Sequence, residues 1–254
     1  MPPAIPFDQQ EYWSERFAKE HSFEWLMPWS VLEPRMQALA LLPADPTARI
    51  LNLGCGNSDL PLDLYQSGFH YVTSVDFVGS IVERLKERSE RAIGWPSPYT
   101  ATANTTSTAT KTSRVPSALD KECPLRFLEM DCLDMTALAA HSFALCIDKS
   151  TSDAISCGDD DQYTKLRTLC EQVARVVIQP GGLWCVVSYS RFRQYEWIEG
   201  LGAGLWRTER IEEIRVDQTG PQQPLNENGQ GDAGSGHIVH VPDVFMYLYI
   251  NRRL

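Results

Sequence analysis

Two glycines that follow an apolar run have residue types and spacing suited to ligand binding. In the stretch 49–59, RILNLGCGNSD, residues 50–53 are typical of a strand buried on both faces. Gly54 and Gly56 then allow a tight turn in which bare backbone faces a ligand. The stretch therefore predicts a small-molecule site at the end of a buried strand.

A carboxylate further along the chain narrows the class of ligand. Asn57 and Ser58 can cap the helix that follows the glycine turn. Residues 71–75 are predicted to form the next strand, which delivers Asp76 at its C-terminal end, 22 residues after Gly54. This is the usual position of a carboxylate that accepts hydrogen bonds from ribose hydroxyls. We therefore expect a ligand that contains ribose.

Two ribose-containing cofactors are compatible with this spacing, a nicotinamide dinucleotide and S-adenosylmethionine. The dinucleotide fingerprint places a third glycine three residues after the second, where this chain has Asp59. A carboxylate there would repel a pyrophosphate, whereas the sulfonium cofactor carries no phosphate. The residues therefore favour S-adenosylmethionine.

The composition indicates a single α/β domain over residues 1–254. The chain has 254 residues, of which 43% are hydrophobic, enough to bury a full core. Its formal charge of −10 disfavours nucleic acid and anionic membranes, and favours a basic protein or a small molecule as partner. Since no apolar stretch approaches membrane-spanning length, we expect a soluble, intracellular monomer.

The cysteines and histidines indicate neither disulfides nor a metal site. Seven cysteines form no CxxC pair, which is typical of reduced thiols in the cytoplasm, with the nucleus as the other compatible compartment. His237 and His240 have the spacing of a metal pair, but they flank a glycine-rich segment without a third ligand. No metal is predicted.

Residues 1–48 are expected to form a helical cover that precedes the first strand. Helices are predicted over 8–20, where Trp13 and Phe17 share a face, and over 31–42, where Ser30 can serve as the N-cap. Because the cover lies outside the sheet, it could fold over the cofactor site.

The middle of the chain alternates between predicted strands and helices. An amphipathic helix is expected over 81–92 and a long helix over 161–178. Between them, the Ser/Thr/Ala/Pro-rich segment 94–124 is predicted to be a disordered insertion. Strands are expected over 125–130, 142–147 and 183–188, and the first two end in Asp131-Cys132 and Asp148-Lys149. In a parallel sheet such ends meet at one edge, where ligands bind.

The last part of the chain predicts a strand pair. A short helix is expected around 193–201, followed by a strand over 206–216, a flexible polar loop over 219–236 and an aromatic strand over 244–250. Two strands joined by such a loop indicate an antiparallel pair at the end of the sheet.

These segments together resemble the seven-stranded (class I) S-adenosylmethionine-dependent methyltransferases. Within them, the chain is similar to the eukaryotic group that methylates lysine in translation elongation factor one alpha. The resemblance spans about residues 11–190 and rests on YWSERF with FEW, LNLGCGNSDL, SVDF, EMD, DKSTSDAI and RVVIQPGG. It implies a Rossmann-like, doubly wound, mostly parallel seven-stranded sheet with an antiparallel last strand and an N-terminal helical cover.

The resemblance also implies roles for individual residues. Gly54 and Gly56 would lie under the methionine portion of the cofactor, Asp76 would hold the ribose, and Asp131 and Cys132 would bracket the adenine. Asp148 and Lys149 would sit at the methyl end as the catalytic pair, and Arg16 could pair with the cofactor carboxylate. The full set of implied cofactor contacts is Trp13, Arg16, Trp25, Gly54, Cys55, Gly56, Asn57, Asp76, Phe77, Asp131, Cys132 and Asp148.

The implied activity is methyl transfer to a lysine of a protein, with Asp148 helping the amine to lose its proton. The chain departs from the group at Asn52, Ser58, Ser150 and Ser152. Two alternatives remain open: methylation of a small molecule, which the altered DKSTSDAI loop favours, and a non-catalytic cofactor-fold protein that binds a partner.

Overall fold

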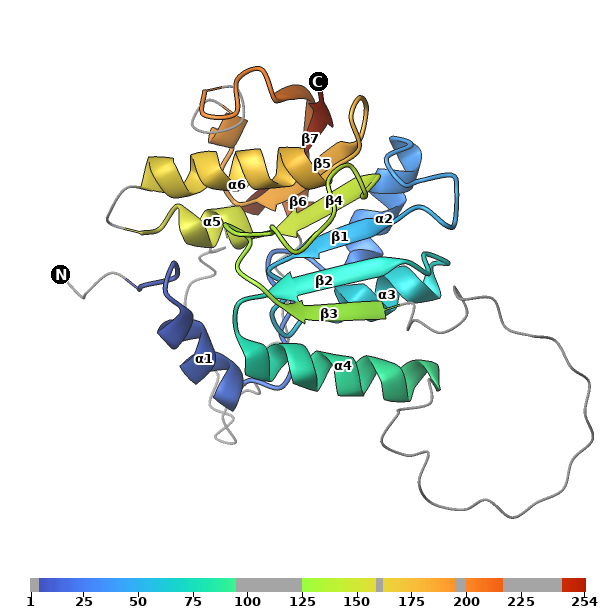
Figure 1. Ribbon diagram of the computed structural model, residues 1–254, viewed down its shortest axis with the longest axis vertical. Coiled ribbons are helices and arrows are strands. Elements are labelled where there is room, and N and C mark those ends of the chain that lie inside the picture. The colour runs from blue at the N-terminus through green and yellow to red at the C-terminus, as the bar shows by residue number, and fades with distance from the viewer. Residues whose placement is uncertain (1–4, 95–124, 159–161, 195–199, 217–243) are drawn as a thin grey trace, which may run out of the picture.

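The computed structural model describes residues 5–94, 125–158, 162–194, 200–216 and 244–254. They form a seven-stranded sheet in the order β3-β2-β1-β4-β5-β7-β6 (Figure 1). Neighbours among β1 to β5 are parallel, whereas β7 runs antiparallel to both β5 and β6. The strands are β1 Ile50–Leu53, β2 Val72–Asp76, β3 Leu125–Glu129, β4 Leu145–Lys149, β5 Leu183–Ser188, β6 Trp206–Val216 and β7 Val244–Arg253. The predicted fold class and the antiparallel last strand are confirmed.

Helices cover both faces of the sheet. On one face α5 and α6 pack over β1, β4 and β5 (Figure 1). On the other, α2 and α3 share one apolar cluster with the sheet, and α3 lies mainly against β2 and β3. Helix α4 packs mainly against β3, and α1 joins it through a small cluster around Phe17 and Leu85. The helices are α1 Gln10–Lys19, α2 Trp29–Ala38, α3 Leu60–Gln66, α4 Gly79–Ile93, α5 Thr151–Ile155 and α6 Gln162–Val176.

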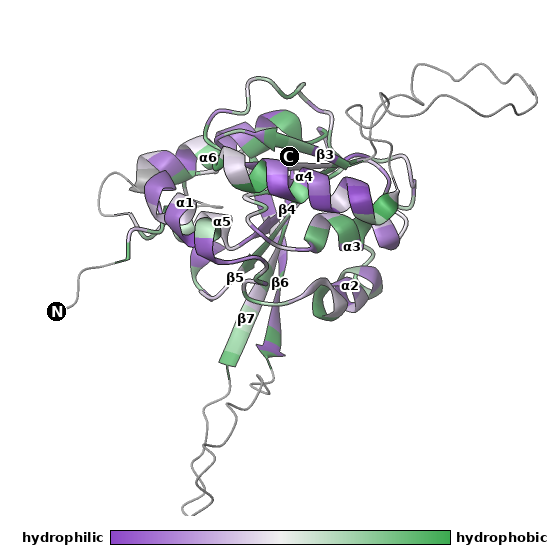
Figure 2. Ribbon diagram, turned by 90° about the horizontal axis from the view of Figure 1, so that it is seen from below, coloured by the Kyte–Doolittle hydropathy of each residue, from purple (hydrophilic) through white to green (hydrophobic). Residues whose placement is uncertain are grey.

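Burial explains the sequence pattern of each element. All residues of β1, β2, β4 and β5 are buried, which is why these strands do not alternate between apolar and charged residues. Helix α4 is amphipathic, and Figure 2 shows hydrophilic and hydrophobic residues mixed along it. Its C-cap, Gly94, has a left-handed backbone with φ +67°, which ends the helix.

Several predicted boundaries are wrong by a few residues. The fourth strand begins at Leu145 rather than at 142, because Phe143 makes an isolated bridge with Val177 instead of joining the sheet. Helix α2 begins at Trp29 with Pro28 as its N-cap, so Ser30 lies inside it. It ends at Ala38, ahead of the left-handed Ala40 (φ +51°). Helix α5 was not predicted.

Some predictions fall outside the described residues. These are most of the insertion at 94–124, the polar loop at 219–236, His237, His240, and the middle of the short helix expected at 193–201. In the part of the chain that is described, no helix is long and apolar enough to cross a membrane.

Candidate functional site

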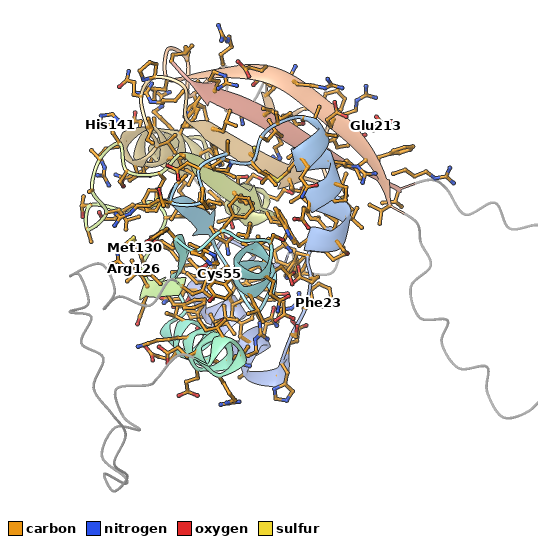
Figure 3. All side chains as sticks on the ribbon, turned by 90° about the vertical axis from the view of Figure 1, so that its right-hand side faces the viewer. Phe23, Cys55, Arg126, Met130, His141 and Glu213 are labelled. Carbon is orange, nitrogen blue, oxygen red and sulfur yellow. The ribbon has the colours of Figure 1, made fainter. Side chains whose placement is uncertain are left out.

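The carboxyl edge of the parallel strands opens into a cavity. Residues after β1, β2, β3 and β4 line it, and the N-terminal segment contributes Phe7, Asp8, Trp13, Phe17 and Trp25. In Figure 1 the arrowheads of β2 and β3 point toward the side of the molecule where α1 lies. In Figure 3, Cys55 of the lining is labelled in the packed interior, whereas Phe23 of the cover lies at the surface. The N-terminal cover thus closes the edge at which the strands end.

Most of the site residues that were predicted from the sequence line this one cavity. Arg16 and Asp148 do not line it. The eleven that do are Trp13, Trp25, Gly54, Cys55, Gly56, Asn57, Asp76, Phe77, Asp131, Cys132 and Lys149.

The glycine turn after β1 is required by a close approach of α5. Gly54 has φ +52°, and a Cβ added there would lie 2.2 Å from Thr151 Oγ1. That hydroxyl donates a hydrogen bond of 3.0 Å to the Leu53 carbonyl. Gly56 also has a positive φ, +50°, and a Cβ there would lie 3.3 Å from Cζ of Phe17. Both positions therefore favour glycine for conformation, and Gly54 also for space.

Asn57 has polar atoms to offer to a ligand. Its side chain is buried and lines the cavity, and neither its amide oxygen nor its amide nitrogen has a hydrogen-bond partner within the described residues. The expected cap of α3 is corrected: the N-cap is Asp59, without a side-chain cap bond, while Ser58 Oγ accepts the N–H of Leu60 at 3.1 Å. Asn57 is thus not used for capping.

Asp76 shapes the turn and faces the cavity. Its carboxylate accepts the N–H of Gly56 at 2.8 Å and the N–H of Val78 at 3.0 Å. Burial raises its pKa, against these backbone hydrogen bonds, which lower it. Because each carboxylate oxygen can accept more than one hydrogen bond, Asp76 retains acceptor capacity for a ligand.

Asp148 supports the cavity without lining it. Its Oδ1 accepts the N–H groups of Thr151 at 3.0 Å and Ser152 at 3.2 Å, at the start of α5. Its Oδ2 is buried and has no partner within the described residues. Burial raises the pKa of Asp148 to about 7. Asp148 does not line the cavity because its side chain turns toward the α5 backbone, and its place at the methyl end of a cofactor stays a prediction.

Lys149 lines the cavity and ties the cover to it. Its Nζ lies 2.5 Å from Glu24 Oε2 and donates to the Trp25 carbonyl at 3.2 Å. Glu24 Oε1 accepts the N–H of Asp59 at 2.7 Å, so one carboxylate joins the cover to both β4 and α3. Burial lowers the pKa of Lys149, and Glu24 opposes that shift. Glu24 was not selected as a site residue, although it stands in the FEW segment.

Arg16 is engaged within the cover. Its Nη2 lies 2.8 Å from Glu20 Oε1, its Nη1 donates to the Tyr12 hydroxyl at 3.1 Å, and its guanidinium lies 4.6 Å from the centroid of Trp25. Arg16 does not line the cavity, and its pairing with a cofactor carboxylate stays a prediction. Its visible role is to hold Trp25 against α1.

The C-terminal end of α1 is fastened to helix α4. Arg84 of α4 donates to the Phe17 carbonyl at 2.6 Å and to the Glu20 carbonyl at 3.0 Å.

Asp59, expected to face the ligand, instead pairs with Arg88 of α4 at 2.7 Å and does not line the cavity. Asp59 is thus not placed to repel a pyrophosphate bound in the cavity. Among the described residues, no group of three histidines, cysteines or acids could hold a metal.

Comparison with known sequences finds methyltransferases. No protein-family model matches the chain. Methyltransferase srdJ of Neurospora crassa is 34% identical over 192 residues, which are 76% of this chain and 70% of that protein. EEF1A lysine methyltransferase 4 of Bos taurus is 26% identical over 74% of this chain and 66% of its own length. The eEF1A lysine and N-terminal methyltransferase homolog of Drosophila melanogaster is 30% identical, but the match spans 61% of this chain and only 18% of that protein.

Comparison with solved structures finds the same fold. The N-methyltransferase NodS from Bradyrhizobium japonicum, solved with S-adenosyl-L-homocysteine, superposes with a TM-score of 0.53 and 14% identity, covering 97% of this chain and 98% of that one. A protein from echinomycin biosynthesis, where a disulfide is converted into a thioacetal, gives a TM-score of 0.54 and 17% identity, over 96% and 93% of the two chains. At these identities the likeness concerns the fold alone.

Proposed function

The chain belongs to the class I S-adenosylmethionine-dependent methyltransferases, and from this premise we propose that it methylates a lysine of a protein, with translation elongation factor eEF1A as the first candidate. The observation that carries the choice of lysine is the similarity to the cattle EEF1A lysine methyltransferase 4 over 74% of this chain. The chain's net charge of −10 supports a basic protein partner.

The residues of the cavity fit S-adenosylmethionine. The Asn57 amide and Trp25 Nε1 are buried without partners among the described residues and can bond to polar atoms of the cofactor. Gly54 and Gly56 also line the cavity, where they present bare backbone to a ligand. In this proposal Asp76 accepts hydrogen bonds from the ribose, Asp131 and Cys132 border the adenine, and the 54–57 turn holds the methionine portion.

The bound cofactor supplies an electrophilic methyl group on a sulfonium. The chain then mainly has to hold the acceptor in line and keep water out, an effect that can be worth about 7–11 kcal/mol. Four aromatic side chains of the cover provide the dry wall: Phe7, Trp13, Phe17 and Trp25. A desolvated amine also loses its proton more easily, because burial disfavours the ammonium form.

In the altered loop after β4, Ser150 has a backbone conformation that is typical of glycine. Ser150 stands where the eEF1A group usually has glycine, and its φ of +74° is left-handed. Such a backbone costs a non-glycine residue roughly 1–2 kcal/mol. The loop departs from the group in residue type while keeping a glycine-like conformation. The change of residue type at Ser150 therefore does not by itself favour the small-molecule alternative.

The proposal is tested with methyl-labelled S-adenosylmethionine. The protein is incubated separately with a eukaryotic proteome extract and with a metabolite extract, beside an Asp76→Ala control. We expect label in protein, recovered as methyllysine after hydrolysis, and reduced in the control. Label that ends only in small molecules would establish the metabolite alternative. Binding of S-adenosylhomocysteine without any label transfer would favour the non-catalytic one.

A further inference from the structure

Asp8 is a carboxylate of the cavity to which no role has been given so far. Its side chain is 13% exposed, and its Oδ2 lies 2.9 Å from Nζ of Lys165 on α6. Both residues line the cavity. The carboxylate therefore already holds a lysine ammonium group inside the candidate site.

The sheet order places Asp8 at the end of the cavity where an acceptor would enter. Asp131 follows β3 and Asp76 is the last residue of β2, so these residues would hold the adenosine of a cofactor at that end. Its methionine portion would then be held toward β1 and β4. Asp8 lies on this side, because a Cβ added to Gly158, just after α5, would be 2.6 Å from Asp8 Oδ2.

Aromatic rings accompany this carboxylate. The Phe7 ring lies 5.9 Å from that of Trp13 and 6.3 Å from that of Trp25, between centroids. Trp13 Nε1 donates to the Phe7 carbonyl at 2.6 Å, which fixes the backbone just before Asp8. Asp8 and these aromatic residues line the same cavity, and a carboxylate together with aromatic rings is a suitable environment for an alkylammonium group.

We propose that Asp8 binds the ε-ammonium group of the acceptor lysine on entry and accepts its proton before methyl transfer, and that Lys165 occupies this place until the acceptor displaces it. The inference rests on the proposed lysine methylation and names the residue that recognises the acceptor. Displacement exchanges one ammonium partner of Asp8 for another, and the Lys165 side chain is 38% exposed, so it can leave the pair. The released Lys165 ammonium can return to water.

Two variants separate recognition from a merely structural ion pair. Asp8→Asn removes the charge that binds the acceptor, whereas Lys165→Met removes the competitor and keeps the apolar stem. With eEF1A as acceptor, we expect Asp8→Asn to raise KM by at least about tenfold, the loss of one charge-assisted contact. We expect Lys165→Met to raise kcat/KM. Affinity for S-adenosylhomocysteine should stay within about twofold in both.

If the pair only fastens the cover to α6, both variants should lose activity and thermal stability alike, which would overturn the proposal. An Asp8→Asn enzyme with unchanged KM would also overturn it.

A second measurement does not depend on the protein substrate. Saturation-transfer NMR with n-butylammonium, on the complex with S-adenosylhomocysteine, should show binding that is strengthened by Lys165→Met and lost in Asp8→Asn. If this binding pattern is found but the wild-type protein does not methylate eEF1A, eEF1A is rejected as the acceptor and the ammonium site at Asp8 is retained. If n-butylammonium binds equally to wild type and both variants, the Asp8 site is rejected.

Discussion

At the residue scale, Asp76 and Asp148 are two buried strand-end aspartates with different surroundings. Asp76 lines the cavity and accepts N–H groups from the ligand-binding turn. Asp148 accepts N–H groups from the start of α5, and its Oδ2 has no partner in the described part of the chain. One carboxylate can thus serve a ligand, while the other positions backbone.

Asp76→Ala should weaken binding of S-adenosylhomocysteine by roughly 1.5–3 kcal/mol, the scale of a hydrogen bond to a charged group. Calorimetry measures the change, and thermal unfolding verifies that the variant is folded. Asp59→Asn is the matched control, because Asp59 lies close in sequence but pairs with Arg88 away from the cavity. Equal affinities in a folded Asp76→Ala protein would show that this carboxylate only orders the turn.

Asp148→Asn should stabilise the protein increasingly as the pH rises. Burial raises the folded-state pKa of Asp148 to about 7 from an ordinary value of 3.8. Between about pH 4 and 7 the folded state therefore holds more protons than the unfolded state, and this group's contribution to the free energy of unfolding falls as pH rises. The amide of Asp148→Asn does not titrate. The free energy of unfolding of this variant, relative to that of the wild type, should therefore increase toward pH 8, by up to about 4 kcal/mol.

Urea denaturation of the wild type and Asp148→Asn at pH 5 and pH 8 measures this difference. If the difference in the free energy of unfolding between the two proteins is the same at both pH values, Asp148 titrates normally in the folded state.

At the element scale, the β1–α3 turn and the cover both depend on contacts between distant segments. Gly54→Ala introduces a Cβ 2.2 Å from Thr151 Oγ1 at a positive φ, whereas Gly68→Ala at φ +97° meets no atom within 4 Å. Both should lose the roughly 1–2 kcal/mol of a left-handed residue. Only Gly54→Ala should lose more than this and also weaken cofactor affinity, as measured by urea denaturation and calorimetry. Equal effects of the two variants would remove the case for a close approach of α5.

Glu24→Gln should loosen the cover. The amide oxygen can still accept the N–H of Asp59, but the charge opposite Lys149 is lost. Lys149 is 8% exposed, and leaving such a charge unpaired typically costs 3–5 kcal/mol. Because the Glu24 side chain is 25% exposed, we expect about 1–3 kcal/mol together with weaker cofactor binding.

A double-mutant cycle with Lys149→Met isolates the Glu24–Lys149 pair. A coupling energy near zero would contradict its role as the fastening of the cover.

The strand ends could be predicted from sequence because buried runs and the residues that follow them are local patterns. The ends of β1, β2 and β3 accordingly placed Gly54, Asp76 and Asp131 in one cavity. The side-chain directions could not be predicted, which is why Asp148 was expected in the cavity and is not there. Glu24 and Asp8 were missed because their partners Lys149 and Lys165 lie 125 and 157 residues away. Such pairs depend on how the N-terminal cover folds back onto the sheet and α6, and the spacing of neighbouring residues in the sequence does not predict this.

At the scale of the whole molecule, one cavity brings together the strand ends, the N-terminal cover and α6. The cofactor cradle comes from the sheet edge, whereas Phe7, Asp8 and Lys165 come from elements outside the sheet. The methyl donor and the acceptor would thus meet where the cover closes on the sheet. The net charge of −10 suits an encounter with a basic protein surface.

The most direct test is the mass of purified, unmethylated eEF1A after incubation with S-adenosylmethionine and this protein. We predict a gain of one or more methyl groups on lysine, localised by fragmentation, and a strongly reduced gain with Asp76→Ala. Unmodified eEF1A, in the presence of a folded protein that binds S-adenosylhomocysteine, would contradict eEF1A lysine as the acceptor.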